Sequence, residues 1–290
     1  LRAAFLKLSA GERADPSQTR AILPTEVDAL LDYQGGLESY HRDEDYRAGV
    51  VEHYGFNVQR MVRLCRSAGV PLVLVDPVSN LRDCPPFKSQ HDESLSAEQL
   101  ARWEECCRDA REAYLRDKHA ALEHWERACE IDPLHADTHY DLAKAYDELE
   151  MYPQAQAAYA QALEQDICPL RMLESMHARL ADIAADSEAP LVDARAIFAD
   201  LSPTGIVGSD RLVDHVHPGI EGHKLLAAAI LEVLVEIDLV HPQSGWESRR
   251  NAAYADPFAS LDNLYFHKGM QRLENLRNWA SGRAQRRQQP

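Results

Sequence analysis

Apolar residues recur at steps of three and four between Tyr46 and Ser67, which is the spacing of one face of an α-helix. The residues on this face are Val51, Tyr54, Val58, Met61, Val62 and Cys65. Gly69 follows, and a glycine just past the last periodic residue is a common helix end. The next run, VPLVLVDP at 70–77, is short, apolar and rich in β-branched residues, so the sequence predicts a buried parallel strand there.

The same order of elements returns towards the end of the chain. A helical pattern at 170–187 leads to the apolar run APLVDA at 189–194, which predicts a second buried strand. A further helix is expected at 219–237, where one face holds Leu226, Ile230, Val233 and Ile237. Helices that alternate with strands favour an α/β doubly wound fold. Two strands are few for a parallel sheet, so we expect further strands upstream of Leu1.

The segment between the two strands, residues 92–168, has no strand pattern and repeats itself with a period of 34 residues. The period pairs Ala121 with Ala155, Trp125 with Tyr159, Ala128 with Ala162 and Asp132 with Asp166. Small residues at two places, a large aromatic between them and an Asp at the turn resemble the tetratricopeptide repeat. Pro133 stands at the usual closing position of the first copy, whereas Ile167 takes that place in the second. The resemblance implies an all-α insertion of paired helices that leans on the α/β part.

The two ends of the chain carry weaker patterns. Residues 1–45 predict a loop and then a short helix that begins near Pro24. The stretch 242–257 predicts a linker, and a final helix is expected from about Ala259, with an apolar stripe of Leu261, Leu264, Leu273 and Leu276. The expected parts are therefore 1–91 for the first α/β segment, 92–168 for the helical insertion, 169–240 for the second α/β segment, and 241–290 for the linker and last helix.

Composition narrows the classes of function. Asp and Glu total 47 against 31 Lys and Arg, a net charge of −16, and such an acidic surface repels the phosphates of nucleic acids. No run of about 18 apolar residues occurs, so no membrane span is expected within this sequence. The six cysteines show no zinc-binding spacing, and no metal or cofactor is expected. Cys84 and Cys168 flank the helical insertion, where either a disulfide or two free thiols would fit.

The segment LVDHVHPGIEGH at 212–223 carries the clearest chemistry. Asp214 and His217 are three residues apart, so in a helical turn their Cβ atoms would lie about 5–6 Å apart. The carboxylate can then hydrogen-bond one imidazole nitrogen and fix the tautomer, while the other nitrogen faces outwards as a general base. Pro218 follows, and proline suits the first turn of the helix expected next. The segment therefore predicts an Asp–His acid–base pair.

The pattern D-x-x-H-P, after a late loop and before a Gly-containing amphipathic helix, resembles the last conserved block of SGNH/GDSL hydrolases. The layout from roughly residue 20 to 240 resembles members of that family that contain tetratricopeptide repeats, through VPLVLVDPVSNLRDCPPFKS, DICPLR and DHVHPGIEGH. The resemblance implies the C-terminal part of a flavodoxin-like, three-layer α/β fold. It also implies that Asp214 and His217 are the acid and base of a serine ester hydrolase.

The resemblance is incomplete, because the G-D-S nucleophile block of the family and its Gly and Asn blocks do not occur in this sequence. The GSD at 208–210 has the wrong order and lies in the same loop as the histidine. We therefore expect the nucleophilic serine upstream of this chain, and we expect the chain alone to be inactive. The implied substrate is an acyl ester of a small molecule or a glycan. Related full-length proteins often begin with a membrane anchor, which implies a place outside the cytoplasm.

Other interpretations of the same segment stay open. Asp214, His215, His217 and His223 offer metal-ligating groups, although their spacing matches no zinc pattern. A purely structural alternative has His217 capping the helix that follows. His215 is expected to be a surface residue or to lie behind the pair, and His223 to pack within the helix.

Three further residues are candidate substrate contacts. Asn80 and Arg82 follow the first predicted strand, at the strand end where doubly wound folds place ligand contacts. Arg171 begins the helix that returns to the sheet, where an arginine could hold a carboxylate or phosphate. Turn-forming and salt-bridging roles fit these residues equally well.

Two classes of function follow from the sequence. One is the serine ester hydrolase described above, and the other is a protein-interaction scaffold that binds a partner through its helical repeats and retains a vestigial hydrolase fold.

Overall fold

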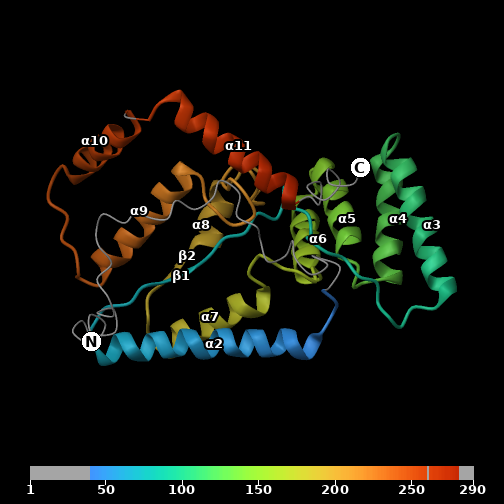
Figure 1. The fold of residues 1–290 in the computed structure, drawn as a ribbon, viewed down its shortest axis with the longest axis horizontal. Coiled ribbons are helices and arrows are strands. Elements are labelled where there is room, and N and C mark those ends of the chain that lie inside the picture. The colour runs from blue at the N-terminus through green and yellow to red at the C-terminus, as the bar shows by residue number, and fades with distance from the viewer. Residues whose placement is uncertain (1–39, 260, 281–290) are drawn as a thin grey trace, which may run out of the picture. The chain divides into compact units, whose positions relative to one another are not determined.

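The computed structural model describes residues 40–259 and 261–280 (Figure 1). The short helix expected near Pro24 lies outside these residues. The first described helix, α2, spans Glu44–Ser67 and confirms the prediction made from its apolar periodicity. Asp43 begins it, because its carboxylate accepts the N–H of Tyr46 at 2.8 Å. After the helix, Gly69 adopts a φ of 63°, the left-handed region that favours glycine.

Two short strands pair in parallel, and both lie within the runs predicted as buried strands. They are β1, Leu74–Asp76, and β2, Leu191–Asp193. Leu74 lies opposite Leu191, and Asp76 lies opposite Asp193. In Figure 1, α2 and α7 (Glu174–Asp186) lie on one side of this pair, and α8 (Ala194–Leu201) and α9 (Ile220–Glu236) lie on the other.

Two apolar clusters hold these elements together. The first joins α2, β1 and α7 through Val58, Val62, Leu74, Leu180, Ile183 and Ala184. The second joins the segment after β1 to α8 and to the loop before α9 through Val78, Ala194, Phe198, Val207 and Leu212, with Leu225 and Leu226 of α9 against it. The second cluster lies beneath the loop that carries Asp214 and His217, so it gives that loop a rigid base.

The three-layer, flavodoxin-like α/β fold expected from the resemblance is wrong. The described residues are mostly helical, and their only sheet has two strands of three residues each. Pro77 directly follows β1 and has no N–H to donate to a ladder. Asp193 ends β2, because its carboxylate accepts the N–H of Ala196 at 2.9 Å and so begins α8. The apolar runs therefore predicted where the two strands lie, but they did not predict how small the sheet is.

The segment between the strands forms helices α3 (Ala97–Tyr114), α4 (Lys118–Ile131), α5 (Ala136–Glu148) and α6 (Tyr152–Glu164). The small residues of the 34-residue period, Ala121, Ala128, Ala155 and Ala162, are at most 1% exposed. Trp125 and Tyr159, the aromatics between them, are buried as well. Alanines at these places let the helices approach closely, and the aromatic ring fills the space beside them.

The aspartates that end each repeat are buried and bind the segment that leads into the insertion. Asp166 accepts the backbone N–H groups of Phe87 and Lys88 at 2.8 and 3.1 Å. Asp132 contacts the Nδ1 atom of His91 at 2.6 Å. Both repeat ends are thereby fastened to the same strip of chain, residues 87–92.

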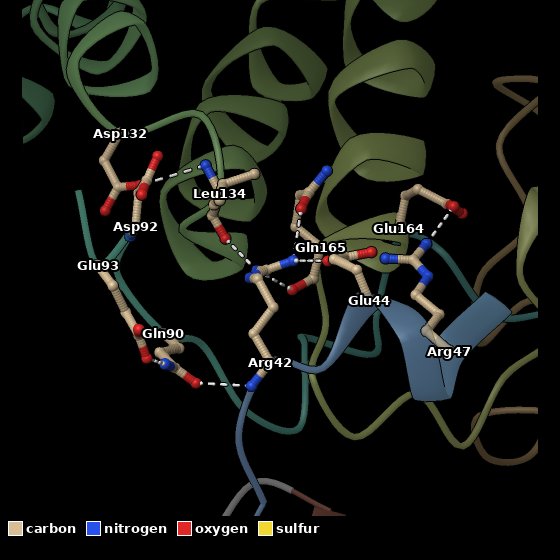
Figure 2. A network of polar contacts seen from close by, with 10 residues as sticks. All are labelled: Arg42, Glu44, Arg47, Gln90, Asp92, Glu93, Asp132, Leu134, Glu164 and Gln165. Atoms are coloured by element: carbon tan, nitrogen blue, oxygen red, sulfur yellow. Dashed lines mark hydrogen bonds and ion pairs between the residues drawn. The ribbon is translucent and has the colours of Figure 1, made fainter. Parts of the chain in front are cut away.

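A second set of polar contacts ties the chain before α2 to the same repeat ends (Figure 2). The guanidinium of Arg42 donates to the carbonyl oxygens of Leu134 and Gln165 at 2.9 and 3.2 Å, and its backbone N–H donates to the side chain of Gln90 at 2.9 Å. Arg47 of α2 pairs with Glu164 at the end of α6. The base of the insertion is therefore connected both to α2 and to the chain before it.

The last described part contains a helix that was not expected. Helix α10, Trp246–Ala259, occupies the stretch predicted to be a linker, and α11, Asn263–Ala280, forms the final helix. The described side chains of α10 and α11 are mostly exposed. Among the described helices, none has the length and apolar character required to cross a bilayer.

A ring stack at the base of the insertion makes its stability depend on pH. The ring of His135 lies 4.6 Å from that of His91 and 4.7 Å from that of Trp103. The pKa of His135 is lowered to about 4, first by burial and then by the neighbouring His91, against an opposing effect of Asp132. The folded protein therefore favours the neutral imidazole of His135.

We expect the free energy of unfolding to fall as the pH is lowered from about 6.5 towards 4. At a pH above the ordinary histidine pKa, the histidine is neutral in both the folded and the unfolded chain, and the folded state keeps its full stability. As the pH falls below that value, the unfolded chain takes up a proton that the folded chain resists, and the folded state loses stability. A lowering of the His135 pKa from 6.5 to about 4 corresponds to a contribution of about 3.4 kcal/mol. Urea unfolding measures the free energy of unfolding across this pH range. In His135→Gln this free energy should change less with pH than in the parent protein, whereas in His119→Gln, a change at an exposed histidine, it should change as in the parent. Equal slopes for His135→Gln and the parent protein would contradict the assignment.

Candidate functional site

The loop between α8 and α9 presents Asp214 and His217 at the tip of a tight turn. The turn is closed by the N–H of Val213, which donates to the carbonyl of His217 at 2.8 Å, and by the N–H of Gly219, which donates to the carbonyl of Arg211 at 3.0 Å. Helix α9 begins only afterwards, with Gly219 as its N-cap. The two residues therefore meet across a loop closed by backbone pairing, and not within a helical turn as the spacing argument assumed.

The Asp214 carboxylate holds the imidazole of His217 from one side. Its Oδ2 atom lies 2.7 Å from Nδ1 of His217, and its Oδ1 atom accepts the backbone N–H groups of Val216 and His217 at 2.9 and 2.7 Å. Burial alone would raise the pKa of Asp214, but these hydrogen bonds outweigh it and leave the pKa below its usual value. The carboxylate is thus ionised at neutral pH, and it favours the tautomer of His217 that carries its proton on Nδ1.

The two members of the pair differ sharply in exposure. The side chain of Asp214 is 7% exposed and that of His217 is 67% exposed. With Nδ1 engaged, the second nitrogen of His217, Nε2, is left on the exposed part of the ring. A buried anion that orients an exposed imidazole is the arrangement that general-base catalysis requires.

The structure also bears on the alternative roles that the sequence left open for the histidines of this segment. The helix-capping role for His217 is wrong, because Gly219 occupies the cap and no side chain bonds to it. His215 turns its ring towards Phe87, with centroids 5.5 Å apart. The expectation that His223 packs is wrong, because it is exposed on α9. Within residues 40–259 and 261–280, no group of three or more His, Cys, Asp or Glu side chains is arranged to hold a metal ion.

Asn80 lies directly behind the Asp–His turn. Its backbone N–H donates to the carbonyl of His215 at 3.0 Å, and its side-chain Nδ2 donates to the carbonyl of Asp214 at 3.1 Å. Its Oδ1 accepts the N–H of Asp83 at 2.9 Å. Because Asn80 is 2% exposed, these contacts face the protein and not a substrate.

Arg171 and Arg82, the other two candidate substrate contacts, are also engaged by the protein. Arg171 is 4% exposed, and its Nη1 donates to the carbonyls of Asn80 and Cys84 at 2.8 and 2.7 Å. Arg82 forms a two-pronged ion pair with Asp147 of α5, at 2.6 and 2.9 Å. The structure places Asn80 against the turn that carries Asp214 and His217, and Arg171 against Asn80, whereas Arg82 turns away to the helical insertion.

Cys84 and Cys168 are both buried free thiols. Burial raises the pKa of Cys84, and it raises that of Cys168 to about 11. Neither thiol is therefore poised as a nucleophile near the pair.

The structure contains a second Asp–His pair that the sequence pattern did not predict. His177 of α7 places Nδ1 2.5 Å from a carboxylate oxygen of Asp76, at the carboxyl end of β1, and is only 5% exposed. His177 lines a small cavity of about 80 Å³, together with Ser79 and Arg195. The signal in the sequence was a polar residue on the apolar face of the 170–187 helix, and an Asp at the end of a predicted strand. Burial of the whole pair favours a structural role over catalysis.

Comparison of the chain with protein-family models, with curated protein sequences and with solved structures finds no match.

Proposed function

We propose that Asp214 and His217 form the acid–base pair of a serine ester hydrolase that acts on acyl esters. The observation that carries this proposal is the 2.7 Å contact between a 7% exposed carboxylate and a 67% exposed imidazole. The resemblance of D-x-x-H-P to the last block of SGNH/GDSL hydrolases supports it. The proposal rests on the pair and its turn, and it does not require the three-layer fold.

The pair would act at each proton transfer of the reaction. As the serine Oγ attacks the ester carbonyl, Nε2 of His217 takes the hydroxyl proton, and the imidazolium then protonates the departing alcohol. Water attacks the acyl-enzyme while Nε2 again accepts a proton, which returns to the serine as the carboxylic acid leaves. Asp214 stays ionised and stabilises the imidazolium at Nδ1 through both steps.

The serine of this reaction would come from a segment outside the chain. Ser209, the serine of GSD at 208–210, donates its backbone N–H to the carboxylate of Asp83 at 2.7 Å. This bond belongs to the packing of the loop against the segment after β1. The expected substrate remains an acyl ester of a small molecule or a glycan.

A fluorophosphonate probe, which labels activated serines, tests the proposal. We expect stoichiometric labelling of a serine in the intact protein and a large loss of labelling in its His217→Ala variant. The matched control is His223→Ala, which removes an exposed histidine six residues away on α9. The chain alone should not be labelled.

Two outcomes would overturn the proposal. One is labelling of the intact protein that does not depend on His217. The other is the absence of any activated serine in the intact protein, which would favour the interaction scaffold predicted as the alternative.

A further inference from the structure

We infer that Asn80 is a positioning residue for the Asp214–His217 pair, and that Arg171 in turn fixes Asn80. That Asn80 supports catalysis rests on the proposed function, but that Asn80 holds the pair in position does not. It gives a structural role to two residues that were predicted from the sequence to contact the substrate.

Asn80 holds two consecutive carbonyl groups at the tip of the turn. Its backbone N–H binds the carbonyl of His215 and its side-chain amide binds the carbonyl of Asp214. These two carbonyls belong to the peptide planes on either side of the His215 Cα atom, so the two bonds hold both planes. The first plane contains the Cα atom of Asp214, so holding it restricts the direction in which the side chain of Asp214 leaves the backbone. The side-chain amide is itself anchored, because its oxygen accepts the N–H of Asp83.

The exposed ring of His217 needs this support because it has few contacts of its own. Its Nδ1 atom contacts Asp214, and its nearest described ring neighbour, His215, lies 6.4 Å away between centroids. The direction of Nε2 therefore depends on the position of the Asp214 carboxylate. A shift of about 1 Å in such a group is enough to lower turnover by about 100-fold.

Arg171 carries the support one step further into the protein. Its Nη1 binds the carbonyl oxygens of Asn80 and Cys84, so it fixes both ends of the segment 80–84. Its Nη2 lies 3.6 Å from Asp166, the buried aspartate at the end of the second helical repeat. A continuous set of polar contacts thus leads from the helical insertion through Arg171 and Asn80 to the Asp–His pair.

The tautomer of His217, read by long-range ¹H–¹⁵N NMR of the imidazole, tests the inference without any substrate. In the neutral form of the His217 imidazole, the Asp214 carboxylate should hold the ring proton on Nδ1. In Asn80→Asp, which keeps the side-chain shape but removes the Nδ2 donor, we expect His217 to lose this single tautomer and become a mixture. The tautomer of His177, fixed by Asp76 at the end of β1, should stay unchanged and report an intact fold.

The matched control is Ser79→Ala, a change at a buried neighbour for which no contact with the turn is seen among the described residues. It should leave the tautomer of His217 unchanged. Arg171→Lys should give an effect between those of the parent and Asn80→Asp, because lysine keeps the charge but reaches only one carbonyl. An unchanged His217 tautomer in Asn80→Asp would overturn the inference. Loss of the His177 signature in that variant would overturn it too, since Asn80 would then support the whole fold.

Activity of the intact protein separates this inference from the proposed function. If both hold, Asn80→Asp should lower kcat by about 10- to 100-fold and leave KM nearly unchanged. If the tautomer changes but the intact protein hydrolyses no ester, the proposed function fails and the positioning role stands. If the protein is a hydrolase and Asn80→Asp alters neither kcat nor the tautomer, only the positioning role fails.

Discussion

Replacing His217 by alanine in the intact protein should lower ester turnover by about three to six orders of magnitude and leave the fold intact. The ring is exposed, so its removal costs little stability, but the reaction loses its only proposed base. Asp214→Asn should lower turnover less, by up to about four orders of magnitude, because the imidazole remains with the wrong tautomer. The double variant should be little worse than His217→Ala alone, since the two residues act as one unit.

Steady-state kinetics on a nitrophenyl ester measure these effects, with circular dichroism as the check on folding. His223→Ala should retain full activity, because that side chain is exposed on α9 and away from the turn. Most of the activity surviving in His217→Ala, or effects of the two single changes that multiply in the double variant, would show that the pair is not the catalytic unit.

Trp125→Ala should destabilise the helical insertion by about 3–5 kcal/mol. Trp125 is 3% exposed on α4, within a cluster that includes Ala121 and Ala128, and its removal leaves a cavity that alanines cannot fill. Urea unfolding followed by circular dichroism measures the loss.

Trp246→Ala is the matched control, because it removes the same side chain from α10, where the ring lies near the surface beside Arg250. We expect it to cost less than about 1 kcal/mol. Similar losses for the two tryptophans would mean that the aromatic of the 34-residue period has no special place in the packing.

Elements with strong local periodicity could be predicted from the sequence. The apolar face of α2, the 34-residue period of α3–α6 and the apolar face of α9 each depend on residues a few positions apart, so a single sequence contains them. The length of the strands could not be predicted in this way. Asp193 belongs to the apolar run of β2 but acts as the N-cap of α8. Local hydrophobicity does not show whether such a residue continues the strand or begins the helix.

In the candidate site, too, contacts between residues close in sequence could be predicted and contacts between distant residues could not. Asp214 and His217 are three residues apart, so their spacing alone predicted that they would meet. The contact of Asn80 with Asp214 joins residues 134 positions apart, and that of His177 with Asp76 joins residues 101 positions apart. Nothing in the local pattern encodes such pairings, so the supporting residues were assigned to substrate binding or overlooked.

The fastening of residues 87–92 to both repeat ends also bears on how the chain folds. The contact between Asn80 and Asp214 closes a loop of 134 residues, about half of which lies in α3–α6. These helices form from local contacts. Once Asp132 and Asp166 have bound residues 87–92, the two ends of the insertion are held close together, so the insertion no longer adds to the flexible length of that loop. Halving the flexible length lowers the entropic cost of closure by about 0.6 kcal/mol. The repeats can therefore serve as a folding scaffold for the turn of Asp214 and His217, in addition to anything they bind.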